Sequence, residues 1–215
     1  MGLYFSRSPG YHKDSYYSFS FSYIVVNLGA DKGQNYIFTR SYLMSMKPID
    51  LEHEVKSVDI VVSKGDAEGN ITYANPIFFK LAGYTQAELL DKPHSIVRHP
   101  DMPKIIFKYL WDSLKAGNDV KAFVKNLSKD GGFYWVFAHV KVATNPDKSF
   151  RNYVSTRRGM SASARAVIEP LYKELLAAEE NGGMDASLAL LESFLKDHGG
   201  SLATFNETMQ KIQNS

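Results

Sequence analysis

The pattern of apolar and polar residues divides the middle of the chain into short strands and short helices. β-Branched and aromatic residues predict five strands, at 59–63, 70–74, 120–127, 133–143 and 150–158. Between the second and third strands, apolar residues recur at helical spacing. Two strands, several helices and three strands make an α+β fold with a five-stranded antiparallel sheet. The helices inserted between strands two and three should cover one face of this sheet and leave a cavity beneath them.

Short polar motifs mark where the inserted helices begin. Asn75 followed by Pro76 predicts a helix N-cap with proline at the first helical position. Thr85 and Glu88 have the spacing of a capping box, so a second short helix should begin there. A longer helix is expected over residues 104–115, where apolar residues again follow the helical period.

The last part of the chain, residues 161–215, has the pattern of amphipathic helices. Leucines and other apolar residues at three- and four-residue spacing form stripes along it. Glycines at 182–183 and 199–200 should divide it into three helices. Such stripes pack into a core or form a surface for a partner, and the pattern leaves both readings open. Before the first strand, residues 47–57 are charged and predict one or two helical turns.

Residues 1–46 differ in composition from the rest of the chain. They are rich in Ser, Tyr and Phe and show no sustained helical or alternating period. Residues 23–28 could form one short strand. We interpret residues 1–46 either as a poorly ordered extension or as a mis-annotated start, with translation beginning at Met44 or Met46.

The composition excludes several classes of function. The chain has 215 residues and a formal net charge of +2, so it has no charge excess of the kind that binds nucleic acid. Because it has no cysteine, disulfides, thiolate metal sites, Cys nucleophiles and a cysteinyl–flavin adduct are all excluded. No apolar run reaches the roughly 18–20 residues that cross a bilayer, and no signal peptide is evident. We expect a cytoplasmic protein without direct membrane insertion.

A charged connector, residues 97–103, lies between the helices and the last three strands. It carries Arg98, His99 and Asp101 together with two prolines, which disfavour helix at the residues before them. An irregular segment beside a core is a usual place for ligand contacts. The connector is therefore the first candidate for a binding site.

The motifs together resemble those of PAS domains. Generic features of that family are found at residues 75–76, 81–85, 88–89 and 132–136. The run from Pro93 to Pro103 is more specific. With residues 124–126 and 169–173 it resembles the sensor domain of aerotaxis receptors, over about residues 55–175. The chain is most similar to the stand-alone PAS half of a bipartite energy-taxis sensor, because no membrane anchor or methyl-accepting signalling domain follows the helices.

The resemblance implies a PAS sensor domain at 47–160 and a helical output or interaction segment at 161–215. It also implies a non-covalently bound FAD, whose redox state is relayed to a membrane-bound methyl-accepting chemotaxis transducer or another signalling protein. That partner would hold the chain at the inner face of the membrane, and the chain could also form a homodimer. Seven residues would contact the cofactor: Arg98, His99, Asp101, Asn75, Asn126, Trp111 and Trp135.

Each of these residues also has an ordinary structural reading. Asn75 is a helix cap, and Asp101 could stabilise the start of the helix that follows it. Arg98 could form a surface ion pair, although its planar fork also suits an FAD phosphate or ribose. The two tryptophans could belong to the core, His99 could be a turn residue, and Asn126 could point outward from its strand.

Two other classes of function stay open. A haem-binding gas sensor would need an axial ligand, and His94 or His99 could provide it. A cofactor-free PAS domain would be a protein-interaction module with an aromatic core. We do not expect an enzyme, because the sequence has no phosphate-binding glycine loop and no nucleophile elbow.

Overall fold

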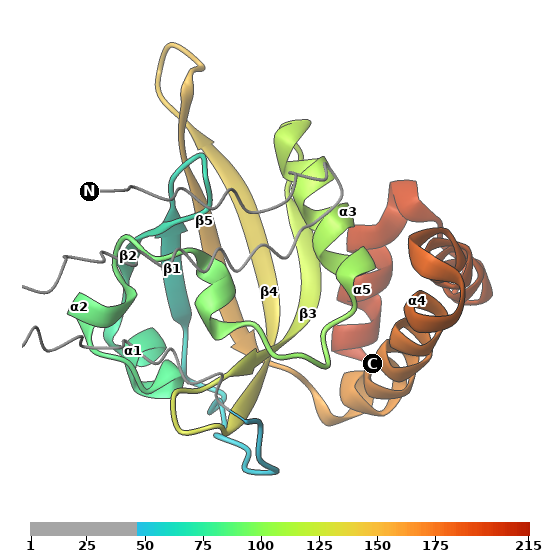
Figure 1. Ribbon diagram of the computed structural model, residues 1–215. Helices are drawn as coiled ribbons and strands as arrows, with labels where there is room; N and C mark the ends of the chain where they lie inside the picture. The colour runs from blue at the N-terminus through green and yellow to red at the C-terminus, as the bar shows by residue number, and fades with distance from the viewer. Residues whose placement is uncertain (1–46) are drawn as a thin grey trace, which may run out of the picture. The chain divides into compact units, whose positions relative to one another are not determined.

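A five-stranded antiparallel sheet organises residues 47–215, the part of the chain that the computed structural model describes (Figure 1). From one edge to the other, the strands are β2 (Ile71–Ala74), β1 (Val61–Gly65), β5 (Phe150–Gly159), β4 (Phe133–Thr144) and β3 (Val120–Leu127). Each strand lies close to its predicted limits, and the α+β fold class is confirmed.

Four short helices connect β2 to β3 and cover one face of the sheet (Figure 1). They are α1 (Pro76–Ala82), α2 (Gln86–Leu89), the 3-10 helix η1 (His94–Val97) and α3 (Lys104–Lys115). The side chain of Asn75 accepts from the backbone N–H of Phe78, and Thr85 and Glu88 form a capping box. Both predicted helix starts are confirmed.

Alternation along the strands gives the sheet two faces with different cover. We call the face under α1 and α3 the inner face and the opposite one the outer face. Buried inner-face positions include Val61, Ser63, Ala122, Asn126, Tyr134, Val136, Ala138, Ser155 and Arg157. On the outer face the buried positions include Phe123, Lys125, Trp135 and Phe137, which lie on β3 and β4.

A long helix covers the β3–β4 part of the outer face. This helix, α4 (Ala162–Asp197), begins at its N-cap Ser161 and is interrupted at Gly183, which has φ 73° and ψ −165°. The ring of Tyr172 in α4 lies 5.9 Å from that of Trp135, and the Tyr172 hydroxyl donates to the backbone oxygen of Phe123 at 2.7 Å. The predicted division of the helical segment near residue 183 is confirmed.

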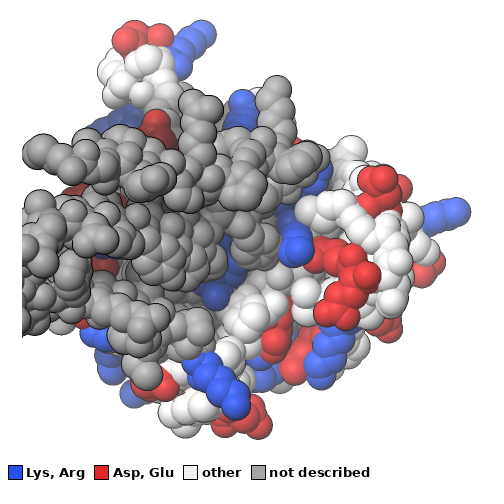
Figure 2. Space-filling view, in the orientation of Figure 1, with Lys and Arg blue, Asp and Glu red and all other residues white. Residues whose placement is uncertain are grey.

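A last helix, α5 (Phe205–Asn214), follows a 3-10 turn, η2 (Leu202–Thr204), and lies between β3 and α4 (Figure 1). Gly199, with φ 72°, ends the preceding helix as predicted. Figure 2 shows Asp and Glu side chains gathered over α4, with Lys and Arg side chains beside them. None of the helices in the described chain combines the length and the apolar content that crossing a membrane requires.

The segment before the sheet is extended, so the helical turns predicted for residues 47–57 are wrong. The backbone N–H of Phe133 donates to the oxygen of Leu51 at 2.8 Å, and the N–H of His53 donates to the oxygen of Phe133 at 2.7 Å. These bonds to β4 satisfy the backbone in an extended form, and they override a local helical preference. The extension and short strand predicted within residues 1–46 lie outside the described residues.

Candidate functional site

A polar cluster lies on the inner face of the sheet, where β1 and β5 meet η1. Nη2 of Arg157 donates to Oγ of Ser63 at 3.0 Å and to Nε2 of His94 at 2.9 Å. Val61 pairs with Arg157 across the two strands, so Ser63, two residues further along, shares a face with Arg157. We call Ser63, His94 and Arg157 the Arg157 cluster.

Arg157 is a buried cation without a carboxylate partner. It is 6% exposed, and no Asp or Glu within residues 47–215 forms an ion pair with it. Burial lowers the pKa of Arg157 to about 10, so the side chain is still protonated at neutral pH. Its guanidinium lies over the ring of Phe78, 5.4 Å from the centroid. Because an uncompensated buried charge is costly, an anion or a strong acceptor brought to this point would be strongly favoured.

Several buried polar atoms on the inner face have no hydrogen-bond partner among the described residues. They are Nη1 of Arg157, Oη of Tyr134, Nδ2 of Asn126 and Oγ of Ser155. Asn126 and Tyr134 are paired across β3 and β4, and the charge of Arg157 acts on the Tyr134 hydroxyl. Burial raises the pKa of Tyr134, so this hydroxyl keeps its proton. Buried polar atoms rarely lack partners, and donors gathered on one face indicate a ligand rich in acceptors.

His94 is neutral in this cluster. Burial, followed by the charge of Arg157, lowers the pKa of His94 to about 3. Because a guanidinium can only donate, Nε2 of His94 must accept, and the proton of the neutral ring lies on Nδ1. Nε2 is also 3.0 Å from Oγ of Ser63. Nε2 of His94, the atom that would bind a haem iron, is therefore already engaged by Arg157 and Ser63.

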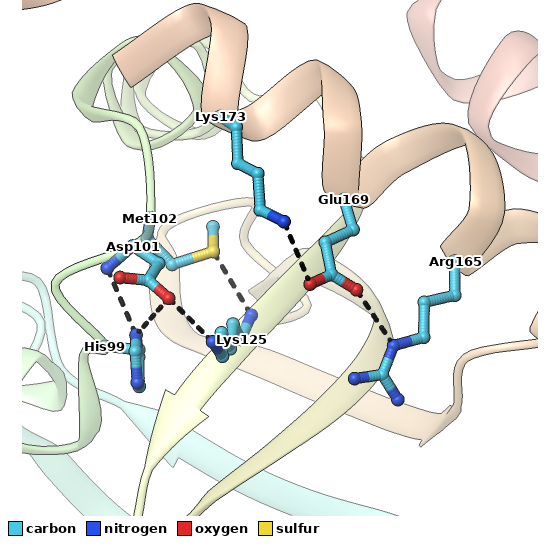
Figure 3. Close-up of polar contacts among 7 residues, drawn as sticks. All are labelled: His99, Asp101, Met102, Lys125, Arg165, Glu169 and Lys173. Atoms are coloured by element: carbon cyan, nitrogen blue, oxygen red, sulfur yellow. Dashed lines mark hydrogen bonds and ion pairs between the residues drawn. The ribbon is translucent and has the colours of Figure 1, made fainter. Parts of the chain in front are cut away.

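The connector residues His99 and Asp101 lie on the outer-face side of the sheet, where Asp101 contacts β3 and the ring of His99 lies 5.9 Å from that of Phe133 in β4. Nζ of Lys125 donates to Oδ2 of Asp101 at 2.7 Å, and the backbone N–H of Asp101 donates to Nδ1 of His99 at 3.1 Å (Figure 3). The backbone N–H of Lys125 also donates to Sδ of Met102 at 3.1 Å. Burial and the Lys125 cation lower the pKa of His99 to about 4. Lys125 pairs with Trp135, so this group lies on the face opposite the Arg157 cluster.

Arg98 lies closer to the Arg157 cluster than His99 and Asp101 do. It forms a β-bridge with Asn126, and its guanidinium carbon is 4.0 Å from the ring centroid of Phe107 in α3. Its charge contributes to the lowered pKa of His94. Of the seven residues predicted to contact a cofactor, Asn126 shares the inner face with the Arg157 cluster but lies two strands away from Arg157, and Arg98 acts on His94 through its charge.

The side chain of Asn75 joins strand β1 to helix α1. Its Oδ1 accepts from the backbone N–H of Val62 at 3.1 Å and from that of Phe78 at 3.2 Å. Its Nδ2 donates to the backbone oxygen of Ile60 at 2.7 Å. These three bonds give Asn75 a structural role, and a contact with a cofactor stays a prediction.

The two tryptophans lie in different places. Trp111, on α3, packs edge-on against Tyr153 with ring centroids 5.4 Å apart. Trp135 is on the outer face against Tyr172, and its Nε1 has no hydrogen-bond partner among residues 47–215. Their contacts with a cofactor also stay predictions.

A shallow groove of about 450 Å³ runs along α4, apart from the Arg157 cluster. Its charged rim consists of Arg165, Glu169 and Lys173. Glu169 lies 3.1 Å from Nε of Arg165 and 3.6 Å from Nζ of Lys173 (Figure 3). These charges satisfy one another, so the groove is a weaker candidate for a ligand than the inner face.

Sequence reasoning did not identify Arg157, Ser63, Tyr134 or Ser155. Residues 153–158 read Tyr-Val-Ser-Thr-Arg-Arg, so neither alternating set is clearly apolar. The sequence therefore does not show which of Arg157 and Arg158 points inward. Only the pairing of β5 with β1 and β4 assigns Arg157 to the inner face.

The sheet and its inserted helices match a known family. The family model described as PAS fold matches residues 71–157, and the five-stranded antiparallel sheet with its inserted helices has this fold. The Aerotaxis receptor of Escherichia coli (strain K12) is 37% identical over 135 residues, which are 63% of this chain and 26% of the receptor. The Nitrogen fixation regulatory protein of Klebsiella pneumoniae is 30% identical over 109 residues, 51% of this chain and 22% of that protein. The chain spans about a quarter of the length of these relatives.

Solved structures include a similar domain described as "Flavin Analogue Sheds Light on Light-Oxygen-Voltage Domain Mechanism". It is 23% identical, with a TM-score of 0.44, over 57% of this chain and 86% of that one.

Proposed function

We propose that this protein is a redox sensor that binds FAD non-covalently on the inner face of the sheet and relays its redox state to a chemotaxis transducer. One observation carries the proposal. Arg157 is a buried cation without a carboxylate partner in the described chain, and unpartnered atoms of Tyr134 and Asn126 lie on the same face. The similarity to an aerotaxis receptor supports the choice of flavin and of taxis as the output.

The residues present fit a flavin ring, which offers several acceptor atoms. When bound, a flavin accepts electrons, and the charge this adds depends on the groups around it. Arg157 would supply a fixed positive charge to that ring, and Tyr134 and Asn126 would donate hydrogen bonds. His94 holds the guanidinium by accepting from Nη2. Arg98 would reach the phosphate or ribose part, because its planar fork matches such oxygens.

The relay would begin at β3. Asn126 is on the inner face, while its neighbour Lys125 binds Asp101 of the connector on the other side of the strand. A change in the hydrogen bonding of Asn126 would therefore be transmitted to β3 and to the connector. A signal passes only if the two redox states favour different arrangements of these groups.

The test is the ultraviolet–visible spectrum of the purified protein before and after dithionite. We expect flavin bands that bleach on reduction in the wild type. Arg157→Met should lose them, and Arg158→Met is the matched control because Arg158 is exposed on the outer face. Equal flavin content in the two variants would remove Arg157 from the site.

Two spectral outcomes would replace the proposal. A Soret band would indicate haem, with His94 or His99 as its ligand. A colourless protein that also fails to take up FAD on refolding would indicate an interaction module.

A further inference from the structure

Helix α3 begins without a cap of its own. Pro103 occupies its N-cap position and makes no side-chain cap bond, and the first turn holds no acidic residue. The acceptor comes instead from α4, because the backbone N–H of Ile105 donates to Oε1 of Glu179 at 2.9 Å. A carboxylate suits this place, since the first N–H groups of a helix lack partners within it and form the positive end of its dipole.

The part of α4 that carries Glu179 is fixed to the sheet. Seven residues earlier, on the same side of the helix, the hydroxyl of Tyr172 donates to the backbone oxygen of Phe123 in β3. The ring of Tyr172 also packs against Trp135 in β4. Glu179 precedes the interruption at Gly183, so it belongs to this fixed part. The sheet therefore holds the carboxylate, and the carboxylate holds the start of α3.

The first turn of α3 leads to the candidate site through Phe107. This residue follows Ile105 by two positions, and the guanidinium carbon of Arg98 lies 4.0 Å from the centroid of its ring. The backbone of Arg98 is fixed separately, by its β-bridge to Asn126. Where α3 begins therefore affects where the guanidinium lies, without moving the backbone that carries it.

The second oxygen of Glu179 makes a purely structural role less favourable. This atom, Oε2, is buried and has no hydrogen-bond partner among residues 47–215. Burying an unsatisfied polar atom costs free energy, so packing alone would favour an apolar side chain at this position. The carboxylate is explained by the one bond it does make, to Ile105.

We propose that Glu179 is a positioning residue for FAD. By holding the first turn of α3, it sets the place of Phe107 and, through that ring, of the Arg98 guanidinium. The inference rests on the proposed function, in which Arg98 reaches the phosphate or ribose part of the cofactor. Glu179 itself would not touch FAD. The helical segment would then complete the binding site as well as follow it in the chain.

The position of Arg98 is measurable in the flavin-free full chain. The nearby ring of Phe107 shifts the NMR signal of the Arg98 Nε–H, so this signal reports their contact. In Glu179→Ala we expect it to move toward its position in an unfolded chain. The Ile105 amide should exchange about tenfold faster, because a charge-assisted hydrogen bond is lost. An unmoved Arg98 signal would overturn the inference.

Two further variants serve as controls. Glu180→Ala removes an exposed carboxylate from the next position of the same helix and should change neither signal. Glu179→Gln keeps an acceptor oxygen for Ile105, so it should restore both. If Glu179→Ala does not fold, Glu179→Asp replaces it, because Asp keeps the charge and withdraws the oxygen by one methylene.

The affinities for FAD and riboflavin separate positioning from a general loss of stability. Riboflavin lacks the phosphates and the ribose, so Glu179→Ala should weaken FAD about tenfold and riboflavin less than about twofold. Arg98→Ala should show the same pattern. The double variant should bind FAD no more weakly than Arg98→Ala alone, because Glu179 acts through Arg98.

The outcomes distinguish this inference from the proposed function. Equal losses for the two flavins, or additive losses in the double variant, would overturn the role of Glu179 and leave the flavin site standing. A wild type that takes up neither flavin would instead overturn the proposed function, and with it the role of Glu179 toward FAD.

Discussion

Arg157 donates a hydrogen bond to Nε2 of His94 across 2.9 Å in the buried space between β5 and η1. The contact defines the charge of both groups: a protonated guanidinium beside a neutral imidazole. No carboxylate within residues 47–215 balances the cation. The pair therefore gives the inner face of the sheet a fixed positive charge, and the following predictions test what that charge does.

Removing the charge should not destabilise the flavin-free protein. We expect Arg157→Met to leave its free energy of unfolding unchanged or to raise it by up to about 3 kcal/mol, because an apolar side chain avoids the desolvation of a buried ion. Urea denaturation of flavin-free protein measures this. A loss of several kcal/mol would instead show that Arg157 is required by the fold itself.

Stability should fall as the pH is lowered below about 6.5. The pKa of His94 is about 3 in the folded protein, against about 6.5 in the unfolded chain. Between these values the unfolded chain binds a proton that the folded protein does not, so acidification favours unfolding. The slope is up to about 1.4 kcal/mol per pH unit for this residue. His99, with a pKa of about 4, adds to it in the same direction.

The variant His94→Gln isolates the contribution of His94. Gln keeps an acceptor for Arg157 but does not titrate, so the slope between pH 6.5 and 4.5 should become shallower. Denaturation curves at several pH values give the slope for each protein. Identical slopes in the wild type and the variant would contradict the assignment.

Tyr134→Phe should stabilise the flavin-free protein by about 1 kcal/mol. The Tyr134 hydroxyl is buried and has no partner in the described chain, so its removal ends a desolvation cost. Tyr172→Phe is the matched control. The Tyr172 hydroxyl donates to the backbone oxygen of Phe123, so its loss should cost about 1 kcal/mol. Thermal unfolding of both variants checks the opposite signs; a destabilised Tyr134→Phe would mean that this hydroxyl has a partner.

Asn75→Ala should lower the free energy of unfolding by about 2 kcal/mol. It removes the cap of α1 and the bonds to Val62 and Ile60 in one step. Asn75→Asp keeps the acceptor and loses only the donor, so its cost should be smaller. If Asn75 is structural, the Asp variant will retain its flavin spectrum; a colourless but folded Asp variant would assign Asn75 to the cofactor.

The local pattern of the sequence predicts the strands and the inserted helices. The runs of β-branched and aromatic residues, the cap at Asn75 and the capping box at Thr85 depend on residues near one another in the chain, and the elements they predict are confirmed. The connector is irregular for an equally local reason, the prolines at 100 and 103. Arg98 and Asn126, which the family resemblance named, form a β-bridge with each other, and their contacts with a cofactor stay predictions.

Only the tertiary structure decides the rest, because it depends on partners distant in the sequence. Residues 47–57 are extended because β4 supplies their hydrogen bonds. Arg157 faces inward and Arg158 outward because of the register between β5 and its neighbours, and the polar composition of β5 gives no sign of it. The carboxylate of Glu179 looks like an ordinary helix-surface group until α4 reaches the start of α3. Periodicity determines the elements, whereas strand register and helix docking determine which side chains meet.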